Sequence, residues 1–201
     1  MIKIIDYGLG NVHAFLNIYK SLGISSSIVN NKDQLLDATH IILPGVGAFD
    51  QAVKMLEKSG LKKCIEDLVM KKNIPILGVC IGMQLLANIS EEGKLKGLGF
   101  IDGNVKKLSN DKSVFLPHMG WNEVIPKKKH KLFNYLEDNP IYYFLHSYYF
   151  ECAKQSSILA SSEYSISFSS VINVNNVYGV QFHPEKSHHN GVQLLKNFAD
   201  L

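Results

Sequence analysis

The chain has 201 residues, of which 46% are hydrophobic and 19% charged, and its formal net charge is +3. This balance excludes collagen-like, coiled-coil and largely disordered chains, and it predicts a single folded domain over residues 1–201. All 21 basic residues are lysines. Sequence-specific nucleic-acid binding relies mainly on the bidentate arginine fork, so we expect a small-molecule or protein partner instead.

The cysteines and the apolar segments indicate the compartment. Cys64, Cys80 and Cys152 are widely spaced and fit neither a disulfide framework nor a zinc-binding pair. The amino terminus begins a strand pattern at once, without the apolar region of a signal peptide. The most apolar stretch, residues 74–89, is too short to span a bilayer. We therefore expect a cytoplasmic protein with reduced thiols.

The first half of the chain alternates short β-branched runs with amphipathic segments. Strands are predicted at 2–5, 26–29, 40–43 and 75–79, and helices over the apolar stripes of 12–22, 49–56 and 61–69. Gly23 follows the first stripe, where a left-handed helix cap would lie. Cys64 falls on the third stripe and is expected to be a buried spacer. This rhythm is typical of a parallel sheet flanked by helices.

The second half changes character. Residues 99–182 consist of short alternating segments with polar connections, which predicts antiparallel hairpins added to the parallel sheet. A last helix is expected to begin near Ser187 and to bury Val192, Leu195 and Phe198. The predicted fold class is therefore α/β, with a mixed, mainly parallel central sheet flanked by helices and extended by antiparallel hairpins.

Residues 78–82, GVCIG, form a thiol version of the G-x-S-x-G nucleophile elbow. The segment follows an apolar strand and precedes a helix predicted from Leu85, Leu86 and Ile89. The two glycines permit a strained turn that presents the sulfur, and the N–H of Ile81 can donate to an oxyanion. A helix start also favours the thiolate. A buried packing cysteine is the alternative for this window.

The segment QFHPE at 181–185 supplies a base and an acid. If the preceding strand continues through it, Gln181, His183 and Glu185 share one face. The carboxylate can then hold one ring nitrogen while the other addresses a thiol, which gives a nucleophile, a base and an orienting group in the order Cys80, His183, Glu185. An isolated His and Glu two residues apart usually lie on the surface by coincidence. The assignment of a catalytic base therefore also depends on the cysteine elbow.

The remaining motifs carry less chemistry. The bend at 43–49, LPGVGAF, can offer backbone N–H groups as the second half of an oxyanion hole, although an ordinary loop between a strand and a helix uses glycines in the same way. Gly8 and Gly10 lack the third glycine of a dinucleotide fingerprint, which excludes NAD. The lysine-rich run 127–131 is expected to be a solvated hairpin tip.

A metal site is not expected. His188 and His189 follow His183 closely, but no cysteine or carboxylate beyond Glu185 completes a ligand set. We expect neither a metal nor an organic cofactor.

Six segments in chain order resemble one enzyme family. They are DYGLGN, PGVGAF, GVCIGMQ, PHMGWN, FLHSYYF and GVQFHPEKS, and they extend over nearly the whole chain. GVCIGMQ and HPE resemble the class I, or triad, glutamine amidotransferases in general. DYGLGN, PHMGWN and FLHSYYF resemble the branch of glutaminase subunits of imidazole glycerol phosphate synthase, rather than the glutaminases of GMP, CTP, anthranilate or pyridoxal phosphate synthesis.

The resemblance implies that L-glutamine is hydrolysed to L-glutamate and ammonia through a thioester. It implies that Cys80 attacks the carboxamide, that His183 shuttles the proton and that Glu185 orients the imidazole. The residues implied to stabilise the oxyanion or bind glutamine are Gly45, Val46, Gly47, Ile81, Gln84, Ser147 and Tyr148. For Ser147 and Tyr148, a half-buried strand is the alternative.

The resemblance also implies a partner, a (β/α)₈ cyclase subunit that forms a heterodimer with this chain and receives the ammonia by channelling. The products would be imidazole glycerol phosphate and aminoimidazole carboxamide ribonucleotide in histidine biosynthesis. The residues implied to lie at the interface are Asn11, Pro117, Met119, Trp121, Tyr143 and Lys186. Trp121 suits an interface anchor, with a core position as the alternative.

The sequence departs from the family pattern at two positions, and rival functions stay open. Ala14 replaces a common serine and Ile81 a common leucine, neither of which touches the triad. A second copy of the same subunit would supply ammonia for surface-polysaccharide sugars and would carry nearly the same motifs. A stand-alone cysteine hydrolase would need no partner. A non-catalytic subunit with a relic site is disfavoured by the intact triad.

Overall fold

A mixed sheet runs through the molecule and joins strands from both halves of the chain. The structure is a computed structural model that describes residues 1–108 and 115–201. One half of the sheet contains β1 (Ile2–Ile5), β2 (Ser26–Val29), β3 (His40–Leu43), β4 (Ile76–Val79) and β13 (Val177–Val180). The other half contains β5 (Ile89–Ser90), β6 (Gly103–Lys107), β8 (Ile125–Pro126), β10 (Tyr148–Cys152), β11 (Ile158–Tyr164) and β12 (Ile166–Val174). A separate two-stranded sheet pairs β7 (His118–Glu123) with β9 (Ile141–His146).

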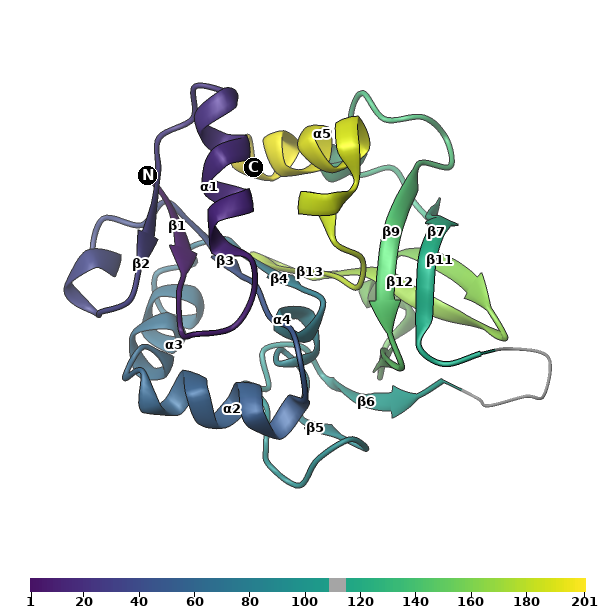
Figure 1. Cartoon of the computed structure of the whole chain (residues 1–201), viewed down its shortest axis with the longest axis horizontal. Coiled ribbons are helices and arrows are strands. Elements are labelled where there is room, and N and C mark those ends of the chain that lie inside the picture. The colour runs from purple at the N-terminus through teal and green to yellow at the C-terminus, as the bar shows by residue number, and fades with distance from the viewer. Residues whose placement is uncertain (109–114) are drawn as a thin grey trace.

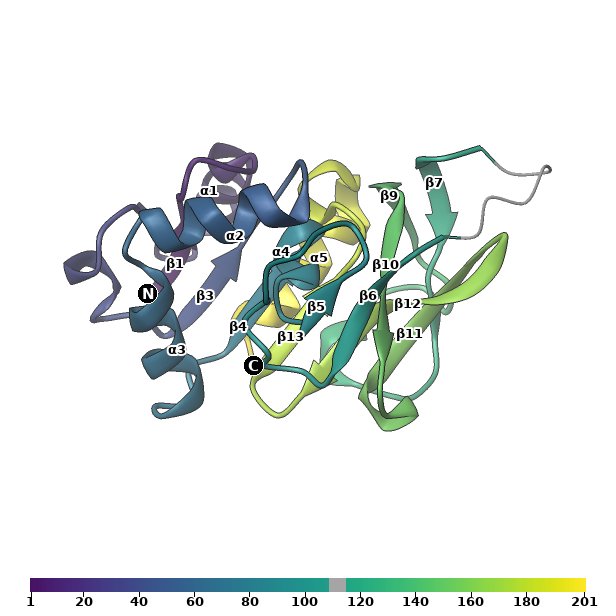
Figure 2. The same ribbon diagram turned by 90° about the horizontal axis from the view of Figure 1, so that it is seen from below.

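The strand order divides the main sheet into two kinds of pairing. The order is β2-β1-β3-β4-β13-β12-β10-β6-β5, with β11 paired to β12 and β8 paired to β11. Pairs from β2 to β13 are parallel, whereas β13, β12, β10 and β6 pair antiparallel with one another. Figures 1 and 2 place the antiparallel strands and the β7–β9 pair together at the end opposite β1 and β2. The predicted α/β class with added antiparallel strands is confirmed.

Helices cover both faces of the parallel half. They are α1 (Val12–Ser21), α2 (Phe49–Lys58), α3 (Lys62–Met70), α4 (Ile81–Gln84) and α5 (His188–Ala199). Single 3₁₀ turns occur at η1 (Asp33–Leu35), η2 (Lys131–Phe133), η3 (Gln155–Ser157) and η4 (Pro184–Lys186). In Figure 1, α1 and α5 lie on one face, and α2 and α3 lie on the other. This is the helix-flanked arrangement that the apolar stripes predict.

Apolar side chains fix α1 and α5 against each other and against the sheet. Phe15 and Tyr19 of α1 and Leu195 and Phe198 of α5 are buried. Burying each such side chain stabilises the fold by about 1.5–3 kcal/mol. The Tyr19 hydroxyl satisfies its polar end by donating to the Leu195 carbonyl at 3.2 Å. Val192 is only partly buried, and Leu194 occupies the core in its place, which corrects the predicted face of the last helix.

Four other expectations are wrong in detail. The helix predicted from Leu85, Leu86 and Ile89 ends before them, at Gln84, because the carbonyls of Leu85 and Leu86 accept from Leu98 and Ile101 instead of from the next helical turn. Residues 99–182 are not purely antiparallel, since β13 also pairs in parallel with β4. The run 127–131 is no hairpin tip, because β8 before it pairs with β11. Cys64 is only partly buried, although it lies on the predicted stripe.

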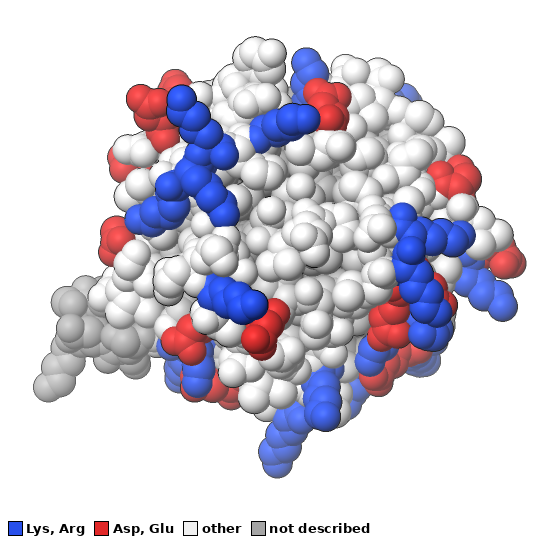
Figure 3. Space-filling view, turned by 180° about the vertical axis from the view of Figure 1, so that it is seen from behind, with Lys and Arg blue, Asp and Glu red and all other residues white. Residues whose placement is uncertain are grey.

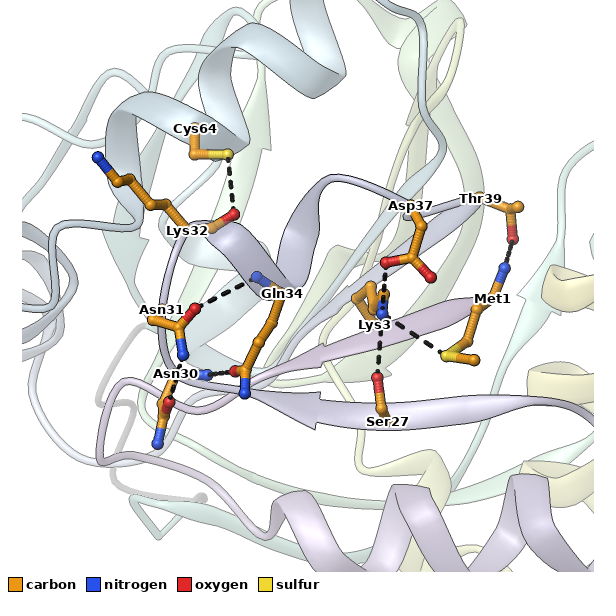
Figure 4. A network of polar contacts seen from close by, with 10 residues as sticks. All are labelled: Met1, Lys3, Ser27, Asn30, Asn31, Lys32, Gln34, Asp37, Thr39 and Cys64. Atoms are coloured by element: carbon orange, nitrogen blue, oxygen red, sulfur yellow. Dashed lines mark hydrogen bonds and ion pairs between the residues drawn. The ribbon is translucent and has the colours of Figure 1, made fainter.

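The buried side chain of Lys3 joins neighbouring elements near the β2 edge of the main sheet (Figure 4). These elements are far from the cysteine elbow in the sequence. Lys3 on β1 is buried, and its Nζ lies 2.8 Å from the carboxylate of Asp37 and 3.3 Å from the hydroxyl of Ser27 on β2. The Lys3 hydrogen bond lowers the pKa of Asp37, more than burial raises it. The ion pair therefore connects β1 and β2 to the loop that precedes β3.

Charged side chains do not form a continuous surface of one sign on the face shown in Figure 3. Lysines and acidic residues are interspersed around the margin of this face, and its centre carries no charged side chain. Among the described residues, no helix has both the length and the apolar character needed to cross a bilayer.

Candidate active site

The elbow after β4 places Cys80 in a strained turn. Cys80 has φ 54° and ψ −110°, a conformation that L-residues rarely adopt and that is common at functional sites. A Cβ at Gly82 would overlap the carbonyl oxygen of Leu43, so only glycine lets α4 start this close to the end of β3. The thiol is 4% exposed. The predicted nucleophile elbow is present, and the sulfur lies in a pocket wall.

The pairing of β4 with β13 brings the second motif to the sulfur. Val79 lies opposite Val180 in parallel register, and the N–H of Cys80 donates to the Val180 carbonyl at 2.9 Å. Parallel strands present their carboxyl ends at one edge of a sheet, where open α/β folds place their ligands. Gln181 and His183 therefore lie beside Cys80, although about 100 positions separate them in the sequence.

His183 and Glu185 form a buried pair, but not in the way the alternation predicts. The Nδ1 atom of His183 lies 2.8 Å from Oε1 of Glu185, and the Glu185 side chain is 3% exposed. The strand ends at Val180, and Glu185 lies in the turn η4. The turn is held by backbone and side-chain contacts: the His183 N–H donates to the Tyr143 carbonyl at 2.8 Å, and the Ser187 hydroxyl donates to the His183 carbonyl at 2.6 Å.

The electrostatics of the site favour the imidazolium form of His183. Burial lowers the pKa of His183, but the charge and hydrogen bond of Cys80, followed by those of Glu185, outweigh burial and raise this pKa to about 10. The nucleophile of a cysteine enzyme is the thiolate, and a neighbouring His⁺ stabilises it. The three groups thus have the geometry and charge of a nucleophile, a general acid and an orienting carboxylate.

A pocket of about 230 Å³ opens at Cys80. This volume is below the range of about 300–1,000 Å³ for drug-sized ligands, so the pocket suits a small substrate. The predicted residues in its lining are Val46, Gly47, Cys80, Ile81, Gln84, Ser147, Tyr148 and His183. Glu185 lies behind His183 and outside the lining. Gly45 is also outside the lining, and a Cβ at this position would overlap the Gly82 nitrogen and the Tyr7 hydroxyl.

The pocket also contains residues that the sequence reasoning missed, namely Glu92, Leu145 and His146, and Pro117, which was expected only at an interface. The Glu92 carboxylate accepts from the N–H of Phe49 at 2.8 Å, at the start of α2. It thereby caps this helix, because the N-cap residue Ala48 has no side chain that could do so. No motif signals Glu92. His146 stands directly before Ser147 in FLHSYYF, so the motif itself could have indicated it.

Gln181 is the most important omission. It is fully buried, and its amide nitrogen lies 3.8 Å from Sγ of Cys80. The sequence pattern did place Gln181 on the same side as His183, which was the available signal. A satisfied core glutamine is the more frequent outcome for such a position, so the pattern alone could not assign it.

Three of the six predicted interface residues, Met119, Trp121 and Tyr143, lie on the β7–β9 pair, and the other three lie elsewhere. Met119 is 65% and Trp121 51% exposed, so the core alternative for Trp121 is wrong. Trp121 lies opposite Tyr143 in the register, with ring centroids 5.8 Å apart, and the Lys186 ammonium lies 5.6 Å from the Tyr143 ring. Pro117 is exposed beside the pocket. Asn11 is exposed at the start of α1, where its side chain accepts from the Ala14 N–H.

Within residues 1–108 and 115–201, no group of three or more His, Cys, Asp or Glu residues has an arrangement that could hold a metal ion.

The family model for class I glutamine amidotransferases matches residues 3–201. The chain belongs to this family. The predicted glutamine amidotransferase is thereby confirmed. The chain is 50% identical to "Imidazole glycerol phosphate synthase subunit HisH" of Leptospira interrogans and 51% identical to the protein of that name from Bdellovibrio bacteriovorus, over the full length of both chains in each case.

A further relative and two solved structures are similar to this chain. "Imidazole glycerol phosphate synthase subunit HisH 2" of Methanococcus maripaludis is 46% identical over 98% of each chain. A solved glutamine amidotransferase matches with a TM-score of 0.78 at 17% identity, covering 99% of this chain and 97% of its own. A glutamine amidotransferase from Thermotoga maritima matches with a TM-score of 0.67 at 19% identity, covering 99% of this chain and 82% of its own. These two structures show that this glutamine amidotransferase shares their fold.

Proposed function

We propose that this chain, as a single domain over residues 1–201, is the glutaminase subunit of an imidazole glycerol phosphate synthase and serves histidine biosynthesis. The observation that carries the proposal is the meeting of Cys80, His183 and Glu185 at one pocket, in a chain about 50% identical throughout to proteins of that name. The elbow, the buried acid and the pocket are the parts that such a reaction requires.

In the first half of the reaction, the Cys80 thiolate attacks the side-chain carboxamide carbon of L-glutamine. The C=O electron pair moves onto oxygen and forms a tetrahedral oxyanion. An amide nitrogen is a poor leaving group unless it is protonated, so His183 donates its proton to that nitrogen as the C–N bond breaks. Ammonia leaves, and a glutamyl thioester remains on Cys80.

In the second half, His183 is neutral and acts as a base. It removes a proton from a water molecule, the hydroxide adds to the thioester carbon, and a second oxyanion forms. Collapse of this oxyanion expels the Cys80 thiolate and forms a side-chain carboxylic acid, which loses its proton to solvent as L-glutamate, while the proton taken from water stays on His183. Glu185 holds Nδ1 throughout, so that Nε2 is the nitrogen that exchanges protons.

Two backbone segments are suited to stabilise the oxyanions. Ile81 is the first residue of α4, where helical N–H groups have no acceptor within the helix. Val46 and Gly47 lie in the same pocket lining and follow Pro44, whose carbonyl accepts from the Tyr7 hydroxyl at 2.8 Å. Donors of this kind, fixed before the reaction, commonly contribute several kcal/mol to transition-state stabilisation.

Gln84, Ser147 and Tyr148 are suited to bind the amino-acid part of glutamine. Gln84 lines the pocket and is almost fully buried, and its Oε1 has no hydrogen-bond partner among the described residues. A buried acceptor without a partner is costly, and an N–H group of the substrate would satisfy it. Ser147 lies where the chain passes from β9 to β10, and the Leu108 N–H donates to its carbonyl at 2.9 Å.

The proposal includes a cyclase partner that docks over β7 and β9 in a heterodimer and receives the ammonia directly. Aromatic residues with one exposed face are enriched in such interfaces, and Trp121 and Met119 offer exposed apolar area close to the pocket. A cytoplasmic location is part of the same proposal and agrees with three free thiols at Cys64, Cys80 and Cys152.

The test is glutamate release from glutamine by the purified chain, measured alone and with a cyclase and its nucleotide ligand. We expect activity that requires Cys80, is lost in Cys80→Ala and rises strongly in the mixture. Trp121→Ala should reduce the rise, whereas Met70→Ala, which removes a similarly exposed apolar side chain on α3, should not. A wild-type chain that stays inactive beside a competent cyclase would overturn the assignment to histidine biosynthesis.

A further inference from the structure

A chain of hydrogen bonds connects strand β7 to the sulfur of Cys80. We propose that Gln181 is a further catalytic residue, which stabilises the Cys80 thiolate by donating an amide N–H to Sγ, and that the hydrogen-bond chain from β7 holds in place the Tyr148 carbonyl that orients this amide through Gln84. The inference deepens the proposed function by adding a residue to the same site, and it rests on that function only for the identity of the substrate.

The chain begins with two buried histidines whose tautomers are fixed by their neighbours. Nδ1 of His146 lies 2.8 Å from the Tyr148 carbonyl, which can only accept, so Nδ1 carries the hydrogen and Nε2 is an acceptor. Nδ1 of His118 lies 3.0 Å from that Nε2 and must donate. The Asn122 amide, 3.3 Å from Nε2 of His118, donates to it in turn.

Both histidines remain neutral in this arrangement. Burial lowers the pKa of His118 to about 4, and burial is also the main cause that lowers the pKa of His146 to about 3. The His118 ring is stacked between Phe144 and Tyr164, with centroid distances of 4.9 Å and 4.0 Å, so it has little freedom to turn. The direction of every hydrogen bond from Asn122 to Tyr148 is therefore determined.

The same Tyr148 carbonyl fixes two glutamine amides. It also accepts from Nε2 of Gln84 at 3.0 Å, which places the nitrogen of that amide toward β10. The second hydrogen of this nitrogen goes to Oε1 of Gln181 at 3.1 Å. Turning either amide over would bring two oxygens or two NH₂ groups together. The nitrogen of Gln181 consequently points to Cys80, at 3.8 Å from Sγ.

The hydrogen bonds that Sγ of Cys80 can make differ between the thiol and the thiolate. The thiol donates to the Leu145 carbonyl at 3.8 Å, and this bond is lost when the proton leaves. The Gln181 N–H becomes a better donor at that moment, because a hydrogen bond to a charged acceptor is stronger than one to a neutral acceptor. Gln181 and His183 are then the side chains that compensate the negative charge.

Other titratable groups face the same space and have to stay constant in a test. They are Tyr7 after β1, Glu92 after β5, His146 on β9, Tyr148 on β10, and His183 and Glu185 at η4. Comparing variants at Gln181 leaves all of them in place, so a difference between pH profiles reports the Gln181 donor itself.

The experiment measures the rate at which iodoacetamide alkylates Cys80 between pH 5 and 9, resolved from Cys64 and Cys152 by peptide mass spectrometry. We expect Gln181→Met to move the midpoint upward by roughly one pH unit, which corresponds to a hydrogen bond at the weak end of those made to charged groups. Gln181→Glu keeps the shape but places an oxygen near the sulfur, and it should move the midpoint further. Gln193→Met on α5 is the matched control and should leave the profile unchanged.

The variant His118→Phe tests whether the hydrogen bonds of β7 affect Cys80. It keeps a stacked ring and removes the hydrogen bonds of His118 to His146 and Asn122. We expect a smaller shift in the same direction, and a double variant with Gln181→Met that shifts no further than Gln181→Met alone, because both act through one donor. Full additivity of the two shifts would overturn the role of the chain from β7.

A folded Gln181→Met protein whose profile superimposes on the wild type would overturn the role of Gln181. If circular dichroism shows that this variant is unfolded, Gln181→Glu decides in the same way. Alkylation needs neither glutamine nor a cyclase. A shifted profile in a protein without glutaminase activity would thus refute the proposed function alone, and an unshifted profile in an active protein would refute this inference alone.

Discussion

Replacing Glu185 with glutamine separates the charge of the triad from its shape. The carboxylate is buried, and its Oε1 lies 2.8 Å from Nδ1 of His183. Its Oε2 has no partner among the described residues, so an NH₂ group in that position breaks no existing hydrogen bond. Glutamine keeps the side-chain length and an acceptor for the Nδ1 hydrogen, and it removes only the negative charge.

The magnitude follows from the distance. Two unit charges 2.8 Å apart at an effective dielectric constant of about 20 attract each other by roughly 6 kcal/mol. The neutral amide retains part of this as a dipole and a hydrogen bond, which leaves a loss of about 3–4 kcal/mol for the imidazolium. We therefore expect kcat for glutamate release to fall by about 10²–10³-fold, with little change in KM.

The pH profile gives a second, independent readout. Glu185 helps to raise the pKa of His183, so Glu185→Gln should lower this pKa toward its ordinary value of 6.5. The proton needed by the leaving amide is then lost at lower pH, and the alkaline limb of kcat should move to lower pH. Glu163→Gln, an exposed change on β11, is the control. A variant within threefold of the wild type, with an unmoved alkaline limb, would refute the role given to Glu185.

Three further predictions concern the supports of the site and the pH dependence of the fold. Gly191→Ala would place a Cβ onto the Pro184 carbonyl and displace the turn η4, so we expect at least a tenfold loss of kcat with Cys80 still present for alkylation. Asp37→Ala should lower the midpoint of thermal unfolding more than Lys3→Met does, because Asp37→Ala leaves the buried Lys3 ammonium without its carboxylate. Melting curves of both variants at pH 7 measure the two midpoints. The raised pKa of His183 contributes stability that is fully present below pH 6.5 and is lost as the pH rises through about 10. The midpoint of urea unfolding should therefore fall over this pH range. In Cys80→Ala, which lacks the main cause of the raised pKa, the midpoint should fall much less.

The parallel half of the fold could be predicted because each of its elements has its own signal. Four short β-branched runs and three apolar stripes mark strands and helices that lie within a residue or two of the predicted positions. The helix predicted after Cys80 failed for a tertiary reason. Leu85 and Leu86 are apolar at helical spacing, but their carbonyls bond to residues 98 and 101, which no local pattern reveals.

The site could be predicted where a motif keeps its chemistry in a few adjacent residues. Cys80 and its glycines, and His183 with Glu185, are of this kind. The extended conformation predicted between His183 and Glu185 is wrong, because Pro184 begins a 3₁₀ turn instead of continuing a strand. Gln181 and Glu92 could not be assigned, since each acquires its role only from a neighbour distant in the sequence.

The Tyr148 carbonyl connects the pocket to both sheets. Residues 146–148 lie where the chain leaves the β7–β9 pair and enters the main sheet at β10. The Tyr148 carbonyl accepts from His146 on one side and from Gln84 on the other. A displacement of β7 and β9 relative to the main sheet would therefore have to stretch one of these two hydrogen bonds. The carbonyl that orients the Gln84 amide, and through it the Gln181 donor at Cys80, is thus hydrogen-bonded to the strand pair that carries the exposed Trp121.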